Sequence, residues 1–230
     1  FSKVLIARIL GGEGIGLYMM AYPIYQIIVS ISAAGIPVAI SIMIAEKLAN
    51  HDIRGVNQVF RMSLKVLTLV GIVFSIGLYA SAKWLIQWQI ITDPRALMPI
   101  QLLAPAIVVV TILSCFRGYF QGFQYMVPTG TSQVFEQIFR VGSMVGLAYY
   151  FIDQGLHFAA GGATFATFPG VLAGLVVLVY FYYRQRKARQ QLIAEQNESA
   201  LMESNCAVIK RLFALAIPVS MANIMLPMVS

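Results

Sequence analysis

Polar and charged side chains interrupt an otherwise apolar run between residues 129 and 151. They are spaced three or four positions apart, so on a helix they form one stripe along its length: Gln133, Glu136, Gln137, Arg140 and Ser143. If the helix begins near Thr129, Arg140 lies roughly 16 Å along it, at about 1.5 Å per residue. That depth is close to the centre of a hydrocarbon core of about 30 Å. A guanidinium group there has to face protein or water, and it is suited to binding an anionic group such as a phosphate.

Glu136 precedes Arg140 by four positions, the spacing at which a carboxylate and a guanidinium pair on one helix. Two roles for Glu136 remain open: it neutralises Arg140, or it binds a substrate or a coupling ion directly. Arg117 opens a basic, aromatic and glycine-containing segment that ends at Pro128. We interpret Arg117 as an anchor in a cytoplasmic turn or as a contact to a lipid phosphate, and a ligand in a cavity is the alternative.

The composition indicates which kind of protein carries this stripe. Hydrophobic residues make up 59% of the 230 and charged residues only 11%, with a mean hydropathy of +0.78. Soluble domains carry about 25% charged residues. Long apolar runs recur along the whole chain, and helices satisfy their own backbone groups in lipid. We therefore expect an all-α, polytopic membrane helix bundle in contact with membrane lipids.

The formal net charge of +7 does not indicate a nucleic-acid partner, because the basic residues lie in short segments between apolar runs. This distribution follows the positive-inside rule. Alternating spans would place most of the basic residues on the cytoplasmic side and only Lys83 and Arg95 on the other. The cytoplasmic set comprises Lys47, Arg54, Arg61, Lys65, Arg117, Arg184, Arg186, Lys187, Arg189, Lys210 and Arg211.

The apolar runs predict three regions: an N-terminal transmembrane lobe over 1–183, a basic cytoplasmic linker over 184–211, and the start of a second lobe over 212–230. The lobe begins with a short first span over 1–9 and a hairpin turn within 11–16. A polar connection is expected over 46–65, and a turn over 117–128. The remaining spans are expected over 15–44, 62–82, 97–116, 129–151 and 158–183.

The second span carries a small and polar face that includes Gln26 and Ser30, and it contains Gly35, Ile36 and Pro37. Proline cannot donate a backbone hydrogen bond, so we expect the helix to kink or open there. Broken helices in transporters often border the substrate path. A kink that serves packing alone is the alternative.

The sequence contains no arrangement typical of an enzyme site. It has no Ser/His/Asp set within reach of one membrane face, no Cys/His cluster and no paired carboxylates. Cys115 and Cys206 match no metal-binding or redox spacing. We expect a protein that is not an enzyme and that has neither a metal site nor a cofactor.

Four segments resemble a known family: 6–18, 34–41, 116–122 (Phe-Arg-Gly-Tyr-Phe-Gln-Gly) and 128–141. They are similar to the polysaccharide-transport branch of the MOP exporter superfamily. Within that branch, the similarity is to the stage V sporulation protein B and YtgP-like group, relatives of the MurJ-type lipid II flippase. The resemblance covers nearly the whole chain. It implies two six-helix lobes around a central cavity, of which this chain would be the first, with its first helix truncated, plus the beginning of the second.

The resemblance also implies an activity, namely alternating-access export of undecaprenyl-linked saccharide precursors across the bacterial plasma membrane. The precursor would be lipid II or a polysaccharide repeat unit, bound through its pyrophosphate. Basic residues early in the first helix belong to the family's cavity, and Lys3 and Arg8 match those positions; lysine keeps the charge but lacks the bidentate grip of arginine. A multidrug or cation antiporter of the same superfamily and a non-transporting membrane scaffold are the alternatives. The expected substrate-binding residues are Arg140, Glu136, Lys3, Arg8, Gln133, Gln137, Gln26 and Ser30.

Overall fold

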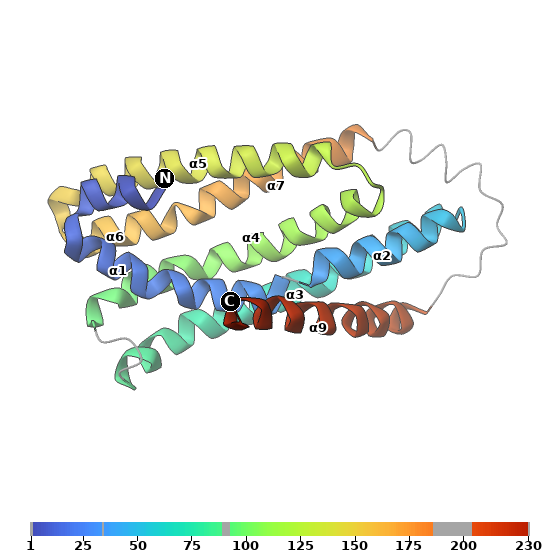
Figure 1. Ribbon diagram of the computed structural model, residues 1–230, viewed down its shortest axis with the longest axis horizontal. Coiled ribbons are helices and arrows are strands. Elements are labelled where there is room, and N and C mark those ends of the chain that lie inside the picture. The colour runs from blue at the N-terminus through green and yellow to red at the C-terminus, as the bar shows by residue number, and fades with distance from the viewer. Residues whose placement is uncertain (1, 34, 89–92, 186–203, 230) are drawn as a thin grey trace.

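The computed structural model describes residues 2–33, 35–88, 93–185 and 204–229, and within them it is an all-α bundle (Figure 1). The predicted fold class is therefore confirmed. The long helices are α1 (Ser2–Ala33), α2 (Ile36–Ala49), α3 (Ile53–Gln87), α4 (Leu97–Gly122), α5 (Val127–Phe151), α6 (Leu156–Phe165), α7 (Thr167–Arg184) and α9 (Asn205–Val229). Two short 3-10 helices, η1 (Pro94–Ala96) and η2 (Ile152–Gln154), lie in the connections before α4 and α6.

The first helix changes direction at Gly11. This residue has φ +67° and ψ −171°, a conformation that glycine adopts without steric cost. The parts of α1 before and after Gly11 run in opposite directions (Figure 1). The expected turn is therefore present, but it is confined to Gly11, because the residues that follow are already helical.

The second predicted span is broken where expected. Helix α1 ends at Ala33 and α2 begins at Ile36, with Pro37 in its first turn, a place where the missing N–H is tolerated. The backbone N–H of Gly35 donates to Oγ of Ser220 in α9 at 3.1 Å. A Cβ added to Gly35 would collide with the backbone carbonyl of Ala216. The break is thus packed directly against α9.

The polar connection expected over 46–65 is mostly helical, so this prediction is wrong. Asp52 accepts a hydrogen bond from the backbone N–H of Gly55 at 2.7 Å and caps α3, which begins at the next residue. A capping carboxylate starts a helix even where the following sequence is polar. The cations expected in a loop therefore lie along the first turns of α3: Arg54, Arg61 and Lys65.

Two other boundaries differ from expectation. Helix α4 continues to Gly122, which leaves only residues 123–126 for the turn before α5. Helix α9 begins at Asn205, earlier than the expected Leu212. Residues 186–203 of the expected linker lie outside the described part of the chain. The sixth span consists of α6 and α7, which meet at Ala166.

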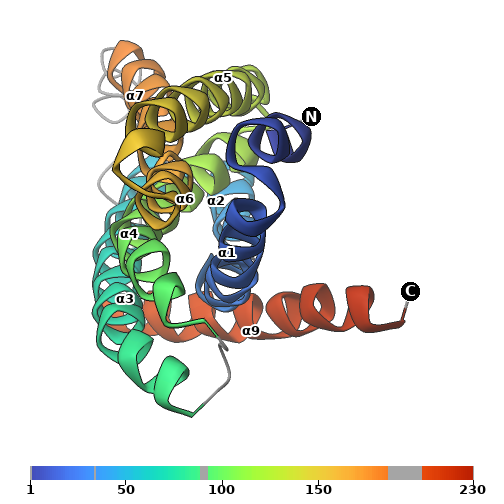
Figure 2. The ribbon, with the colours of Figure 1, turned by 90° about the vertical axis from the view of Figure 1, so that its left-hand side faces the viewer.

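Helix α4 is the centre of the bundle, packing against α1, α2, α3, α6 and α7 (Figure 2). Its glycines allow a close approach to α2, since a Cβ on Gly118 would lie 2.8 Å from the carbonyl oxygen of Pro37, and one on Gly122 would lie 2.7 Å from Cβ of Ile44. Small residues four apart are typical of helix contacts in membranes. In contrast, α5 packs on α6 and α7 and touches its neighbour in sequence, α4, only slightly.

Among the described residues, three helical segments are long and apolar enough to cross a membrane: Ile53–Trp84, Pro94–Gly122 and Phe158–Arg184. Helix α5 is not one of them, because its polar stripe lowers its hydropathy. The α2–α3 and α4–α5 turns, the end of α7 and the start of α9 lie at one end of the bundle (Figure 1). This is the end that receives most of the basic residues. Its assignment to the cytoplasm stays a prediction.

Candidate functional site

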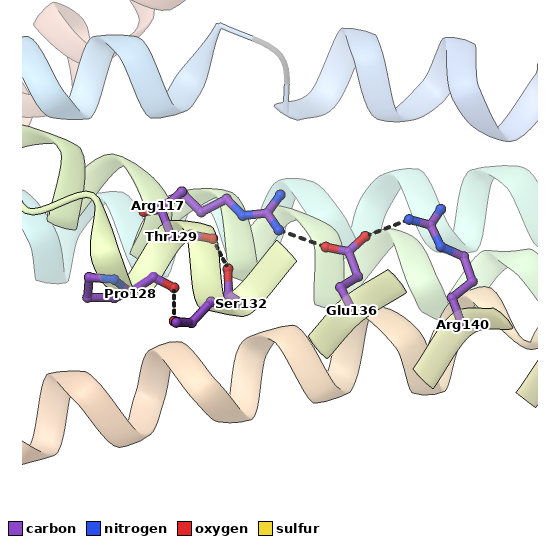
Figure 3. A network of polar contacts seen from close by, with 7 residues as sticks. Arg117, Pro128, Thr129, Ser132, Glu136 and Arg140 are labelled. Atoms are coloured by element: carbon purple, nitrogen blue, oxygen red, sulfur yellow. Dashed lines mark hydrogen bonds and ion pairs between the residues drawn. The ribbon is translucent and has the colours of Figure 1, made fainter. Parts of the chain in front are cut away.

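Two arginines from different helices share one carboxylate between α4 and α5 (Figure 3). Nη2 of Arg117, on α4, lies 2.7 Å from Oε2 of Glu136, on α5. Nη2 of Arg140, one turn further along α5, lies 3.1 Å from Oε1 of the same carboxylate. We call these three residues the arginine–glutamate network. Glu136 is therefore paired with Arg140, as their spacing allows, and in addition bridges two helices.

The network carries more positive charge and more hydrogen-bond donors than Glu136 can satisfy. Its side chains are largely withdrawn from solvent, with exposed fractions of 21% for Arg117, 12% for Glu136 and 21% for Arg140. Each guanidinium has five N–H donors. The Nε atoms of both arginines are buried and find no acceptor in the part of the chain that the structure describes. The network therefore has a formal charge of +1 and retains donors that water or an anion could satisfy.

Glycines on α7 position the carboxylate and Arg140. A Cβ on Gly170 would lie 2.6 Å from Cβ of Arg140, and a Cβ on Gly174 would lie 3.3 Å from Cβ of Glu136. The backbone of α7 therefore lies directly against the base of both side chains. This close packing explains why the two charged residues belong to the least exposed stripe of α5: Ser132, Glu136, Arg140, Met144 and Ala148.

The network lies beside the break between α1 and α2. Arg117 immediately precedes Gly118, where an added Cβ would lie 2.9 Å from Cα of Pro37 at the start of α2. In Figure 3 the side chains of Glu136 and Arg140 point toward the side on which α1 and α2 run, and the side chain of Arg117 extends toward Glu136. Irregular backbone at membrane depth is tolerated where it is buried in protein or lines a water-filled cavity. The network and the break thus form one region bordered by α1, α2, α4, α5 and α7.

The other predicted residues lie on α5, on α1 or outside the described part of the chain. Gln133 and Gln137 are exposed on α5, each three positions before a charged member of the network. Gln26 is exposed on α1 and donates from Nε2 to the hydroxyl of Tyr22 at 2.8 Å, and Ser30, one turn later, is partly exposed. The side chains of two further predicted residues lie outside the described part of the chain: Lys3 and Arg8.

Arg117 is the residue that the sequence interpretation missed. It is a helical residue of α4 that pairs with Glu136, so its interpretation as an anchor in a turn is wrong. A usable signal was present, because Gly118 and Gly122 are four positions apart and such spacing is typical of a packed helix. Reading the helix through to Gly122 would have placed Arg117 on an internal helix rather than in a loop.

Other chemistry is not evident in the described residues. No group of three or more His, Cys, Asp or Glu side chains is close enough to hold a metal ion there. Cys115 is buried and Cys206 is exposed, and neither forms a disulfide. The arrangement is therefore one that can bind an anion by charge and hydrogen bonding.

Comparison with known proteins identifies the family of the chain. The sequence model of the family described as polysaccharide biosynthesis protein matches residues 3–226. The chain belongs to this polysaccharide biosynthesis protein family. The resemblance to the polysaccharide-transport branch of the MOP exporter superfamily is thereby confirmed, and this member of the polysaccharide biosynthesis protein family is a multi-pass membrane protein.

Relatives of this polysaccharide biosynthesis family member occur in Bacillus subtilis (strain 168). The chain is 36% identical to stage V sporulation protein B over 80% of its own length and 31% identical to the lipid II flippase MurJ over 77%. It is 27% identical to the uncharacterized membrane protein YabM over 97%. The chain spans 36%, 34% and 41% of the lengths of these three relatives. No solved structure matches it.

Proposed function

We propose that this chain forms part of a membrane transporter, and not an enzyme, that moves an undecaprenyl-linked saccharide precursor across the membrane by alternating access. In this proposal Arg117 and Arg140 bind the pyrophosphate of the precursor. The observation that carries it is the arginine–glutamate network, in which two partly buried guanidinium groups share a single carboxylate.

The physical problem for such a transporter is to carry a pyrophosphate and a hydrophilic sugar through a hydrocarbon layer. Cations in a hydrated cavity compensate the charge of the phosphates, and arginine binds phosphate oxygens through short, charge-assisted hydrogen bonds. In the free protein, Glu136 holds both guanidinium groups in place. A pyrophosphate that enters the region would accept hydrogen bonds from the remaining Nη donors, and it would reach the buried Nε–H groups only after the guanidinium groups turn.

The surrounding polar residues have roles in the same proposal. Gln133 and Gln137 are exposed beside the network, and Gln26 and Ser30 have accessible side chains on α1. All four can form hydrogen bonds with sugar hydroxyls or water. Lys3 and Arg8 would add positive charge from the first part of α1. The relative named lipid II flippase supports a lipid-linked substrate, and the lipid that this protein carries belongs to the proposal.

The network disfavours a cation antiporter. A cationic substrate needs a carboxylate that can accept it, whereas both oxygens of Glu136 are already paired with arginines. Proton or ion coupling at Glu136 would first require one of these pairs to open. The formal charge of +1 repels a second cation and attracts an anion.

Arg140→Ala in the intact protein should lower translocation of the lipid-linked precursor by about 10- to 100-fold, because a hydrogen bond to a charged group contributes roughly 1.5–3 kcal/mol. The measurement is transport of a fluorescent lipid-linked precursor in proteoliposomes, with protein amounts matched. Arg184→Ala is the matched control, since Arg184 is exposed at the end of α7. Unchanged transport in Arg140→Ala would remove Arg140 from the site.

A cysteine at position 137 tests the alternating access in this proposal. In a variant without Cys115 and Cys206, Gln137→Cys should react with a membrane-impermeant thiol reagent from one side of the membrane at rest. Saturating substrate should shift the reaction to the other side, with the rates changing at least threefold. A cysteine at Gln185, expected at the cytoplasmic end of α7, should react from one side only. If substrate does not change the labelling rate of Gln137→Cys from either side, the result would favour a non-transporting scaffold.

A further inference from the structure

A second cationic region lies away from the arginine–glutamate network, at the end of the bundle where α3 and α9 begin. It is a pocket of about 490 Å³, which we call the α3–α9 pocket. Its lining contains three cations and three carboxamides together with one apolar side chain: Arg54, Asn57, Gln58, Arg61, Met62, Lys65 and Asn205. The amide of Gln58 donates from Nε2 to Oδ1 of Asn205 at 2.9 Å, so the two helices are joined by the lining of the pocket.

Two of the three cations in this pocket have no acidic partner among the described residues. Asp52 pairs with Lys47 at 3.3 Å, and Glu46 pairs with Arg211. Arg61 and Lys65 are exposed and form no ion pair with any described residue. None of the described residues that line the pocket is acidic. Two cations one helical turn apart, with carboxamide donors beside them, form an arrangement suited to a single phosphate group.

The cationic residues continue into an apolar stripe on the same side of α3. Arg54, Gln58, Arg61 and Lys65 follow one another at intervals of four, three and four residues, and the same spacing continues toward the far end of the helix. The residues that continue it are large and exposed: Leu69, Ile72, Ile76 and Tyr79. One face of α3 is thus charged in its N-terminal part and apolar in its C-terminal part.

We propose that the α3–α9 pocket binds the phosphate of an anionic membrane lipid, with the acyl chain lying along the apolar stripe of α3. A free phosphate ion would bind the cations but would make no contact with the exposed apolar residues further along α3. An anionic phospholipid matches both parts of the face. Basic pockets between membrane helices at the cytoplasmic surface are suited to such headgroups.

The pocket also joins the expected first lobe to the beginning of α9, the helix that continues from the expected linker into the expected second lobe. Arg61 and Lys65 lie on α3 of the first lobe, and Asn205 lies at the start of α9. A headgroup bound there would contact both helices at once. Occupancy of the pocket would therefore stabilise the arrangement of α3 and α9 seen here.

The double variant Arg61→Gln/Lys65→Gln tests this proposal in the intact protein purified in an uncharged detergent. Bound dioleoyl-phosphatidylglycerol and dioleoyl-phosphatidylcholine are counted by native mass spectrometry during titration. We expect the wild-type protein to bind phosphatidylglycerol in preference to phosphatidylcholine. The variant should bind phosphatidylglycerol roughly 10- to 30-fold more weakly, at about fivefold for each cation lost, with binding of phosphatidylcholine unchanged.

Arg184→Gln/Lys210→Gln is the matched control, because it removes the same charge from exposed positions outside the pocket. An equal loss of phosphatidylglycerol binding in this control would overturn the proposal, because binding would then depend on the overall surface charge and not on the pocket. Displacement of phosphatidylglycerol by millimolar inorganic phosphate would also overturn it and assign the pocket to a soluble anion. If the double variant fails to fold, Arg61→Lys, which keeps the charge, must retain binding while Arg61→Gln loses it.

Discussion

Glu136→Gln should destabilise the protein more than either Arg117→Gln or Arg140→Gln. The variant leaves two partly buried guanidinium groups without a counter-charge, whereas loss of one arginine leaves a carboxylate that is still paired with the other. Removing one partner of a buried ion pair costs about 3–5 kcal/mol. Because the network is 12–21% exposed, we expect a loss of about 3 kcal/mol in the free energy of unfolding for Glu136→Gln. Unfolding of the intact protein in mixed detergent micelles measures this loss.

The triple variant Arg117→Gln/Glu136→Gln/Arg140→Gln separates the structural role of the network from its role in transport. It removes all three charges, so most of the stability lost in Glu136→Gln should return. Transport should remain at background, because the cations proposed to bind pyrophosphate are absent. Recovery of both stability and transport would show that the network only holds α4 and α5 together. Wild-type stability of Glu136→Gln would contradict the ion pairs themselves.

Gly170→Ala should reduce both stability and transport, although it adds a single methyl group. The added Cβ would lie 2.6 Å from Cβ of Arg140, 3.0 Å from its Cα and 3.0 Å from the carbonyl oxygen of Glu136. Two of these three atoms belong to the backbone, so α5 and α7 have to move apart. Overpacking of this kind costs roughly 1–3 kcal/mol. The accompanying shift of Arg140 relative to Arg117 should lower transport at least tenfold.

Gly142→Ala is the matched control for Gly170→Ala. Gly142 lies on α5, two positions after Arg140, and a Cβ there would meet no atom within 4 Å. The same methyl group should therefore leave transport unchanged and raise helix stability slightly, since alanine favours a helix over glycine by up to about 1 kcal/mol. Melting curves and transport assays on both variants give the comparison. Equal effects at the two positions would contradict the close packing of α5 on α7.

The sequence predicted the parts of the site that depend on local spacing. The pairing of Glu136 with Arg140 follows from their separation by one helical turn, and the break at Gly35 follows from the adjacent Pro37. Both depend on one helix only. The contact between Arg117 and Glu136 could not be predicted in this way, because it depends on how α4 and α5 are placed by a third helix, α7, on which α5 packs.

The polar segment over 46–65 shows why composition alone does not locate the ends of helices. Its basic residues lower the hydropathy of the segment, as a loop would, yet Asp52 caps a helix that contains them. The cap is a side-chain to backbone contact that depends on one residue and not on average polarity. The basic face of α3, and with it the α3–α9 pocket, is therefore visible only once the helix is in place.

In the transporter proposed above, the hydrogen bond between Gly35 and Ser220 would constrain how α9 can tilt against α1 and α2. The bond ties the break between α1 and α2 to α9. If α9 moves away from this point, the backbone N–H of Gly35 loses its acceptor, which costs about 1–3 kcal/mol. A rotation of α9 relative to α1 and α2 that keeps this bond intact would have its axis near Gly35. The two ends of α9 would then move in opposite directions.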